Sequence, residues 1–133
     1  MQQAYLIGLA HYPDHTLAGV PNDLVLIEQG LQQQGFAAAE IHTFGAADGT
    51  RAGLQRILTQ IRTDFAAVEP ASARSHCFFY FGGSGMLALE PLQGGFQPVD
   101  GDAANFQSAL AFTELNRQLP VRPGIQVTVV LDC

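Results

Sequence analysis

The sequence predicts an α/β fold with three layers and a mainly parallel central sheet. Apolar, strand-like runs alternate along the chain with segments of helical spacing, which is typical of parallel strands joined by helices. The run at residues 77–81 is continuously apolar and aromatic, as expected for a strand buried on both faces. It ends in Gly82-Gly83-Ser84-Gly85, and the carboxyl ends of such strands are where open α/β sheets place their sites.

The first part of the chain predicts strand, helix, strand. Residues 4–9 form the first expected strand, followed by a polar loop at residues 10–19. A helix is expected to begin at Pro21, because proline suits a first turn in which its missing N–H has no partner. Gly35 is its expected end cap, and residues 38–44 are the second expected strand.

The second part adds two helices and two strands. Thr50 is expected to cap a helix whose apolar side chains lie on one face: Leu54, Ile57, Leu58, Ile61 and Phe65. The central run is the third strand, and the Gly- and Pro-rich residues 86–102 predict a loop or a small hairpin. Thr113 is expected to cap a short helix, and the β-branched residues 126–131 are the fourth strand.

Charge and cysteine content narrow the function classes. Six Arg, no Lys and twelve acidic residues give a net charge of −6, which argues against nucleic acid as a partner and suits a basic one. Most acidic residues on a small domain are nevertheless solvated surface. The sequence has no uninterrupted stretch of about 18 apolar residues, so we expect no membrane-spanning segment and no membrane partner. Cys77 and Cys133 lie in strand-like runs without a disulfide framework, so we expect a reducing, cytoplasmic location.

We expect residues 1–133 to be a single domain within a longer chain. The last predicted strand ends at Asp132-Cys133, and the carboxyl tip of a buried strand is where an α/β site belongs.

An ordered set of short motifs resembles a known family. These are Ala4-Tyr5-Leu6-Ile7-Gly8, Leu17-x-Gly19-x-x-Asn22-Asp23, Thr50-Arg51-Ala52, Phe79-Tyr80-Phe81-Gly82-Gly83-Ser84-Gly85, Pro98-Val99-Asp100 and Val129-Val130-Leu131-Asp132-Cys133. Together they resemble the large-subunit half of the caspase-like cysteine peptidases, of the metacaspase and bacterial orthocaspase type. The resemblance implies a three-layer α-β-α fold with core strand order 2-1-3-4.

The resemblance also implies that the catalytic dyad is missing. The family's histidine falls on Ser84, whose hydroxyl cannot act as a general base at neutral pH. The family's nucleophile would follow Cys133, which stands one residue early and is expected to face the other side of its strand. We therefore expect a pseudo-enzyme. The alternative is that Cys133 acts as a displaced nucleophile.

Two acidic residues, Asp23 and Asp132, match acidic positions of the family. In the metacaspases the positions of Asp23 and Asp132 line a pocket for Arg or Lys, which implies a basic peptide or protein partner here. Self-association or a small-subunit partner is also expected. The simpler reading is that Asp23 is a first-turn acid that stabilises its helix dipole.

A rival function is an Arg/Lys-specific cysteine endopeptidase of which this chain is a fragment. His11 or His15, in the loop expected at the same edge as Ser84, or a water molecule would then serve in place of the missing histidine. The same two histidines are weak candidates for a metal site.

No metal or cofactor is expected. Asp100 lies where many metacaspases bind calcium, but without the accompanying carboxylates. Gly83-x-Gly85-x-x-Ala88 matches a dinucleotide fingerprint, yet Pro91 cuts short the helix it requires. His76 and Cys77 are neighbours on opposite strand faces, so they cannot form a dyad.

Overall fold

The computed structural model describes residues 1–69 and 74–133 and has a central sheet of four parallel strands. Its order is β2 (Ile41–Phe44), β1 (Gln2–Gly8), β3 (Ser75–Gly82) and β7 (Ile125–Asp132). Every neighbouring pair is parallel. The α/β fold is confirmed, and so is the core order 2-1-3-4, because β7 is the fourth predicted strand.

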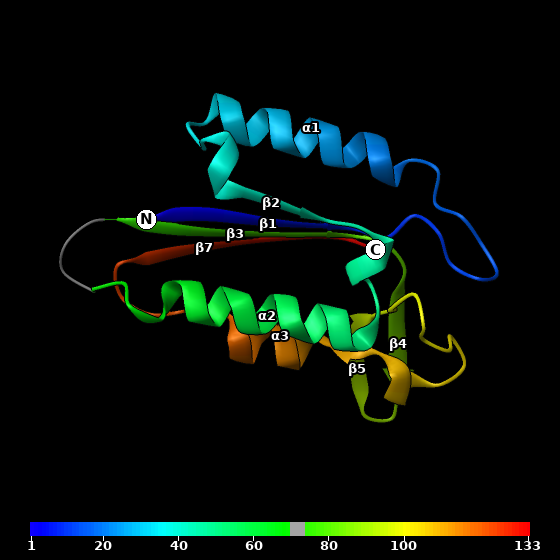
Figure 1. Ribbon diagram of the computed structural model, residues 1–133. Helices are drawn as coiled ribbons and strands as arrows, with labels where there is room; N and C mark the ends of the chain where they lie inside the picture. The colour runs from blue at the N-terminus through cyan, green and yellow to red at the C-terminus, as the bar shows by residue number, and fades with distance from the viewer. Residues whose placement is uncertain (70–73) are drawn as a thin grey trace.

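Helices cover both faces of this sheet (Figure 1). Helix α1 (Val20–Gln33) lies on one face, and α2 (Arg51–Ala66) with α3 (Phe112–Gln118) lies on the other. Thr50 caps α2 as predicted, because its hydroxyl accepts the Gly53 N–H at 3.0 Å. Gly35 follows the end of α1 with φ +100°, the left-handed conformation that glycine adopts without strain.

Strand β3 lies between two apolar clusters because its side chains alternate between the faces. Cys77, Phe79 and Phe81 pack toward α2 and α3. Tyr80 packs on the other side with Leu6, and α1 covers this second cluster. The prediction that residues 77–81 form a strand buried on both faces of the sheet is thus confirmed.

Several element boundaries differ from the prediction by one to three residues, and two of these differences have a clear local cause. The second strand begins at Ile41, because residues Ala38–Glu40 form the 3₁₀ turn η1, in which the Glu40 carboxylate accepts the Ala37 N–H at 2.8 Å. Helix α3 begins at Phe112 and not after Thr113. Its preceding residues, Leu110–Ala111, form the short strand β6, so the chain passes directly from strand to helix without a side-chain cap.

A small antiparallel sheet follows Ser84. It consists of β4 (Gly85–Leu89), β5 (Leu92–Phe96) and β6, so the predicted hairpin gains a third strand. Phe96 packs on Phe81 with ring centroids 4.3 Å apart, which fixes the small sheet against the end of β3. The 3₁₀ turns η2 (Ala46–Asp48) and η3 (Phe106–Ser108) complete the elements. Within residues 1–69 and 74–133, no helix combines the length and apolarity needed to cross a membrane.

Candidate functional site

The candidate residues gather at the carboxyl edge of the parallel sheet. Gly8, Gly82 and Asp132 occupy one level across β1, β3 and β7. The Leu9 N–H donates to the Gly82 carbonyl at 2.8 Å, which extends the β1–β3 pairing beyond the strands. The loops after β1 and β3 therefore leave from the same edge, beside the last residues of β7 (Figure 1).

The loop after β1 folds back as a small hairpin. The Tyr12 N–H donates to the His15 carbonyl at 2.9 Å, and the Leu17 N–H donates to the Ala10 carbonyl at 2.7 Å. The Tyr12 and His15 rings stack with centroids 4.7 Å apart and an interplanar angle of 6°. This stacking fixes the orientation of the His15 imidazole.

His15 reaches Ser84 across the edge. Its Nε2 lies 2.7 Å from the Ser84 Oγ, and its Nδ1 lies 2.6 Å from the Asp14 Oδ1. This hydrogen bond from His15 lowers the pKa of the Asp14 carboxyl group. Of the two histidines predicted for this edge, His15 is the one that hydrogen-bonds to Ser84 in the described part of the chain.

Tyr12 also holds the backbone of Ser84. Its hydroxyl accepts the Ser84 N–H at 2.9 Å and donates to the Gln97 carbonyl at 3.0 Å. Burial raises the pKa of Tyr12, so the phenol stays protonated and able to donate. A Cβ on Gly83 would lie 2.8 Å from this hydroxyl, which explains why glycine precedes Ser84.

Asp23 and Asp132 line one hollow of about 390 Å³ between α1 and the end of β7. The Tyr80 hydroxyl donates to the Asp132 Oδ2 at 3.3 Å. Burial, followed by the charges of Asp132 and Asp23, raises the pKa of Tyr80 to about 12. The two carboxylates thus act on the same phenol, although Asp23 also lies in the first turn of α1, as the helix-dipole reading requires.

Cys133 lies beside the same edge. A hollow of about 450 Å³ is lined by Asp23 and Asp132 again, together with Gly83, Cys133 and residues 16–20. The Cys133 Sγ is 3.2 Å from the position that a Cβ on Gly85 would take. Burial and the Asp132 charge raise the pKa of Cys133, which disfavours the thiolate form a nucleophile needs.

Cys77 and His76 belong to the framework, as predicted. Burial raises the pKa of Cys77 to about 12, and its side chain is fully enclosed. The His76 Nε2 lies 2.9 Å from the Thr128 Oγ1 on the opposite face of β3.

A search of residues 1–69 and 74–133 finds no group of three or more His, Cys, Asp or Glu side chains placed to hold a metal ion. The Asp100 carboxylate accepts the Arg51 N–H at 2.9 Å and so caps the start of α2.

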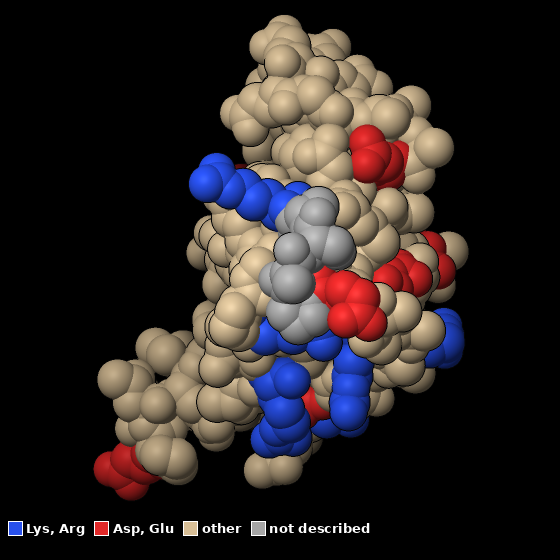
Figure 2. All heavy atoms as spheres, turned by 90° about the vertical axis from the view of Figure 1, so that its left-hand side faces the viewer, with Lys and Arg blue, Asp and Glu red and all other residues tan. Residues whose placement is uncertain are grey.

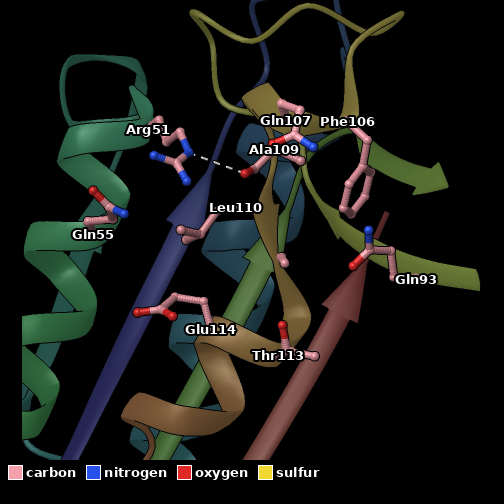
Figure 3. A pocket seen from close by; sticks show the side chains of 10 residues that line it. Arg51, Gln55, Gln93, Phe106, Gln107, Ala109, Leu110, Thr113 and Glu114 are labelled. Atoms are coloured by element: carbon pink, nitrogen blue, oxygen red, sulfur yellow. Dashed lines mark hydrogen bonds between the residues drawn. The ribbon is translucent and has the colours of Figure 1, made fainter. Parts of the chain in front are cut away.

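Among the further hollows, two border helix α2. One, of about 320 Å³, is shown in Figure 3, where the Arg51 Nε donates to the Ala109 carbonyl at 3.3 Å. The other, of about 480 Å³, is lined by three of the six arginines, Arg62, Arg117 and Arg122. Figure 2 views the molecule from the amino ends of the strands. Several arginines gather there on the side that α2 and α3 cover. None of the predicted site residues lines either hollow.

Two residues at this edge, Tyr12 and Asp14, were not predicted from the sequence as part of the site. Their signal was present as a dense polar cluster directly after the first strand, in a loop that follows a carboxyl end. The pairing of Asp14 with His15 depends on the turn between them, which residue types alone do not determine.

Comparison with known proteins agrees with this geometry. The family description "Caspase domain" matches residues 1–133. No curated protein matches the chain. A Geobacter sulfurreducens protein, solved by crystallography as a structural genomics target, superposes with a TM-score of 0.68 and 21% identity. The match covers 96% of this chain and 48% of that protein, so this chain spans about half of its length. The chain belongs to the caspase-domain family.

Proposed function

We propose that this domain is a metacaspase-type member that binds basic segments of peptides or proteins and has lost the family's cysteine-peptidase chemistry. One observation carries the proposal. Asp23 and Asp132 line a common hollow at the edge of the sheet where Ser84 lies. The resemblance to the metacaspases assigns the family's histidine to the position of Ser84. The recognition side of a basic-peptide site is thus retained without the base of the dyad.

The chemistry of the hollow suits an arginine or lysine side chain. Two carboxylates can form charge-assisted hydrogen bonds to a guanidinium or ammonium group. The walls between them are aliphatic, from Leu26, Ile27, Val130 and Leu131, and can pack along the methylene stem of the bound residue.

A second contact would use the outer edge of β7. In the described part of the chain this strand pairs with β3 alone, and its residues Val129 and Leu131 are each 39% exposed. An edge of this kind accepts another strand. A small-subunit strand or a second copy of the chain fits this position.

The pocket is tested by calorimetry with an arginine-containing peptide. The Asp23→Asn/Asp132→Asn variant is expected to bind at least about tenfold more weakly, because both charge-assisted partners are lost. The matched control is Glu69→Gln/Glu90→Gln, which makes the same charge change at two exposed sites away from the hollow and should bind as wild type does. Equal binding by both variants would remove the pocket.

The rival function is an active Arg/Lys-specific cysteine endopeptidase whose nucleophile follows Cys133. It is favoured by the His15 imidazole, which lies within hydrogen-bonding distance of the position that the family's histidine occupies. A chain extended beyond Cys133 would then cleave fluorogenic Arg or Lys peptides, and His15→Gln would abolish cleavage. We expect no turnover, and turnover lost on mutation of a cysteine after Cys133 would establish the rival.

A further inference from the structure

Ser84, His15 and Asp14 form a chain of hydrogen bonds that the cysteine-peptidase chemistry of the family does not use. The Ser84 Oγ lies 2.7 Å from the His15 Nε2, and the His15 Nδ1 lies 2.6 Å from the Asp14 Oδ1. A nucleophile, a base and an orienting group linked in this order meet the geometric requirement for an activated hydroxyl. Here the three side chains come from the end of β3 and the hairpin after β1.

The direction of the hydrogen bonds follows from Asp14. Its pKa is lowered by the His15 contact, so Asp14 is an ionised carboxylate that can only accept. The Nδ1 of His15 must therefore carry the proton, and in the neutral imidazole the Nε2 presents a lone pair. That lone pair accepts the Ser84 hydroxyl hydrogen, which is the arrangement needed for proton removal.

Tyr12 holds both reacting groups in place. It stacks on the His15 ring, and its hydroxyl accepts the Ser84 N–H at 2.9 Å. Its own hydrogen bond to the Gln97 carbonyl ties it to the segment after β5. The Ser84 backbone and the His15 ring are thus oriented by one buried side chain, which makes Tyr12 a positioning residue.

The surroundings define a substrate class. Ser84 is half-buried and Gly85 is exposed, so this turn lies at the protein surface. The hollow of about 450 Å³ beside it is bordered by Gly83 and Thr16, the chain neighbours of Ser84 and His15, and contains the carboxylates of Asp23 and Asp132. An acyl group entering this hollow meets negative charge, which favours a cationic one.

Two backbone donors at this position, the N–H groups of Gly83 and Ser84, are already used. The Gly83 N–H donates to the Asp132 carbonyl at 3.2 Å, and the Ser84 N–H donates to Tyr12. Neither is available to stabilise an oxyanion, and losing one such donor typically slows acyl transfer by about 10²–10³-fold. The site therefore suits activated esters, whose good leaving groups lower the barrier, and not peptide bonds.

We propose that Ser84 is a nucleophile that accepts acyl groups from activated esters, with His15 as its base and Asp14 as the residue that positions His15. The Ser84 Oγ bonds to the carbonyl carbon, the ester C–O bond breaks, and the hydroxyl proton passes through the His15 Nε2 to the leaving oxygen. Water then attacks the acyl carbon and gives a proton to the His15 Nε2. The bond between that carbon and the Ser84 Oγ breaks, the carboxylic acid leaves, and the proton passes from His15 to the Ser84 Oγ. The preference for a cationic acyl group rests on the proposed basic-peptide pocket, whereas the nucleophile does not.

The test is acylation by p-nitrophenyl acetate, followed by release of nitrophenolate and by peptide mapping of the acetyl group. Wild type is expected to carry the acetyl group on Ser84, and Ser84→Ala should lose it. His15→Gln should slow labelling by roughly a hundredfold or more, because the base is lost. Asp14→Asn should slow it by about tenfold, because its carboxylate is exposed and positions the imidazole through solvent-screened contact.

Controls separate the nucleophile from general reactivity. His11→Gln, an exposed histidine of the same loop, should react as wild type does. If Ser84→Ala misfolds, Ser84→Cys should instead be alkylated by iodoacetamide at position 84 in a His15-dependent way. Acetylation found on Cys133 alone, or equal in wild type and Ser84→Ala, would overturn the proposal.

The cationic preference has its own readout. An arginine ester should react faster than its neutral counterpart in wild type, and Asp23→Asn/Asp132→Asn should remove that advantage, so that the two esters react at similar rates. Peptide binding without labelling refutes the nucleophile and leaves the proposed function intact. Labelling without peptide binding refutes the proposed function and leaves the nucleophile intact.

Discussion

The two ends of strand β3 each have a histidine close to a group that could act as a nucleophile, but only the carboxyl end brings the two side chains together. At the amino end, His76 and Cys77 are neighbours in sequence and lie on opposite faces of the sheet. At the carboxyl end, Ser84 and His15 are 69 residues apart and in hydrogen-bonding contact. Adjacent residues of a strand point to opposite faces of the sheet, so their side chains do not meet. Loops that leave the same edge of a parallel sheet can bring residues that are distant in sequence together.

The largest expected contrast is between the two thiols. Cys77 has a pKa of about 12 and is fully buried, so its thiolate population at neutral pH is extremely small. Cys133 is exposed, although its pKa is also raised. In the folded protein iodoacetamide should therefore modify Cys77 at least about a hundredfold more slowly than Cys133.

Peptide mapping after timed alkylation measures both thiols in one sample. In denaturant the two should react at similar rates, because burial is removed. Comparable modification of Cys77 in the folded state would mean that the amino end of β3 opens and is not a sealed core.

The second contrast concerns Arg122, which sits at the amino end of the sheet. One guanidinium nitrogen donates to the carbonyls of Phe65 and Val68, the latter at 2.9 Å. These carbonyls lie at and just beyond the end of α2, whose last turn has no basic residue of its own. Arg122→Met should lower the free energy of unfolding by about 1–2 kcal/mol, because the charge at the helix end is lost while the stem still packs.

The matched variant is Arg56→Met, an exposed arginine on α2, which should change stability by no more than about 0.5 kcal/mol. Urea unfolding followed by circular dichroism gives both values. An equal effect of the two substitutions would show that Arg122 contributes as surface charge and not as a helix cap.

The framework was predictable from sequence because it depends on local patterns. The apolar run at residues 77–81 predicts a strand buried on both faces, and the alternation of strands with helices predicts the parallel sheet. Residues 38–40 were assigned wrongly, since the contact of Glu40 with the Ala37 N–H favours a 3₁₀ turn over a longer strand. Strand β6 is two residues long and leaves no periodic signal.

The carboxyl edge was only partly predictable. Asp23 and Asp132 were placed together there only through the resemblance to the metacaspases. The contact between His15 and Ser84 could not be predicted, because Tyr12 orients the hairpin at residues 10–17. The Tyr12 hydroxyl hydrogen-bonds to Ser84 and Gln97, which lie far from it in sequence. Such long-range contacts have no counterpart in the local sequence pattern.

The smallest expected contrast is the response of the two ends to acid, and it concerns His76. Burial lowers its pKa below the usual value of about 6.5, because the fold disfavours the charged imidazole. The unfolded chain then binds the proton more readily. The contribution of His76 to stability is thus fully present above pH of about 6.5 and declines as the pH falls toward the pKa of the folded state. His76→Gln, which can still hydrogen-bond to Thr128, should therefore lose less melting temperature than wild type between neutral and mildly acidic pH.

The control for this measurement is His11→Gln, which replaces an exposed histidine and should leave the acid-dependent loss unchanged. If His76→Gln and wild type lose the same melting temperature, then His76 is as well solvated in the folded protein as in the unfolded chain. The amino end of β3 would then be open to water at His76 while Cys77, one residue along on the other face, remains enclosed.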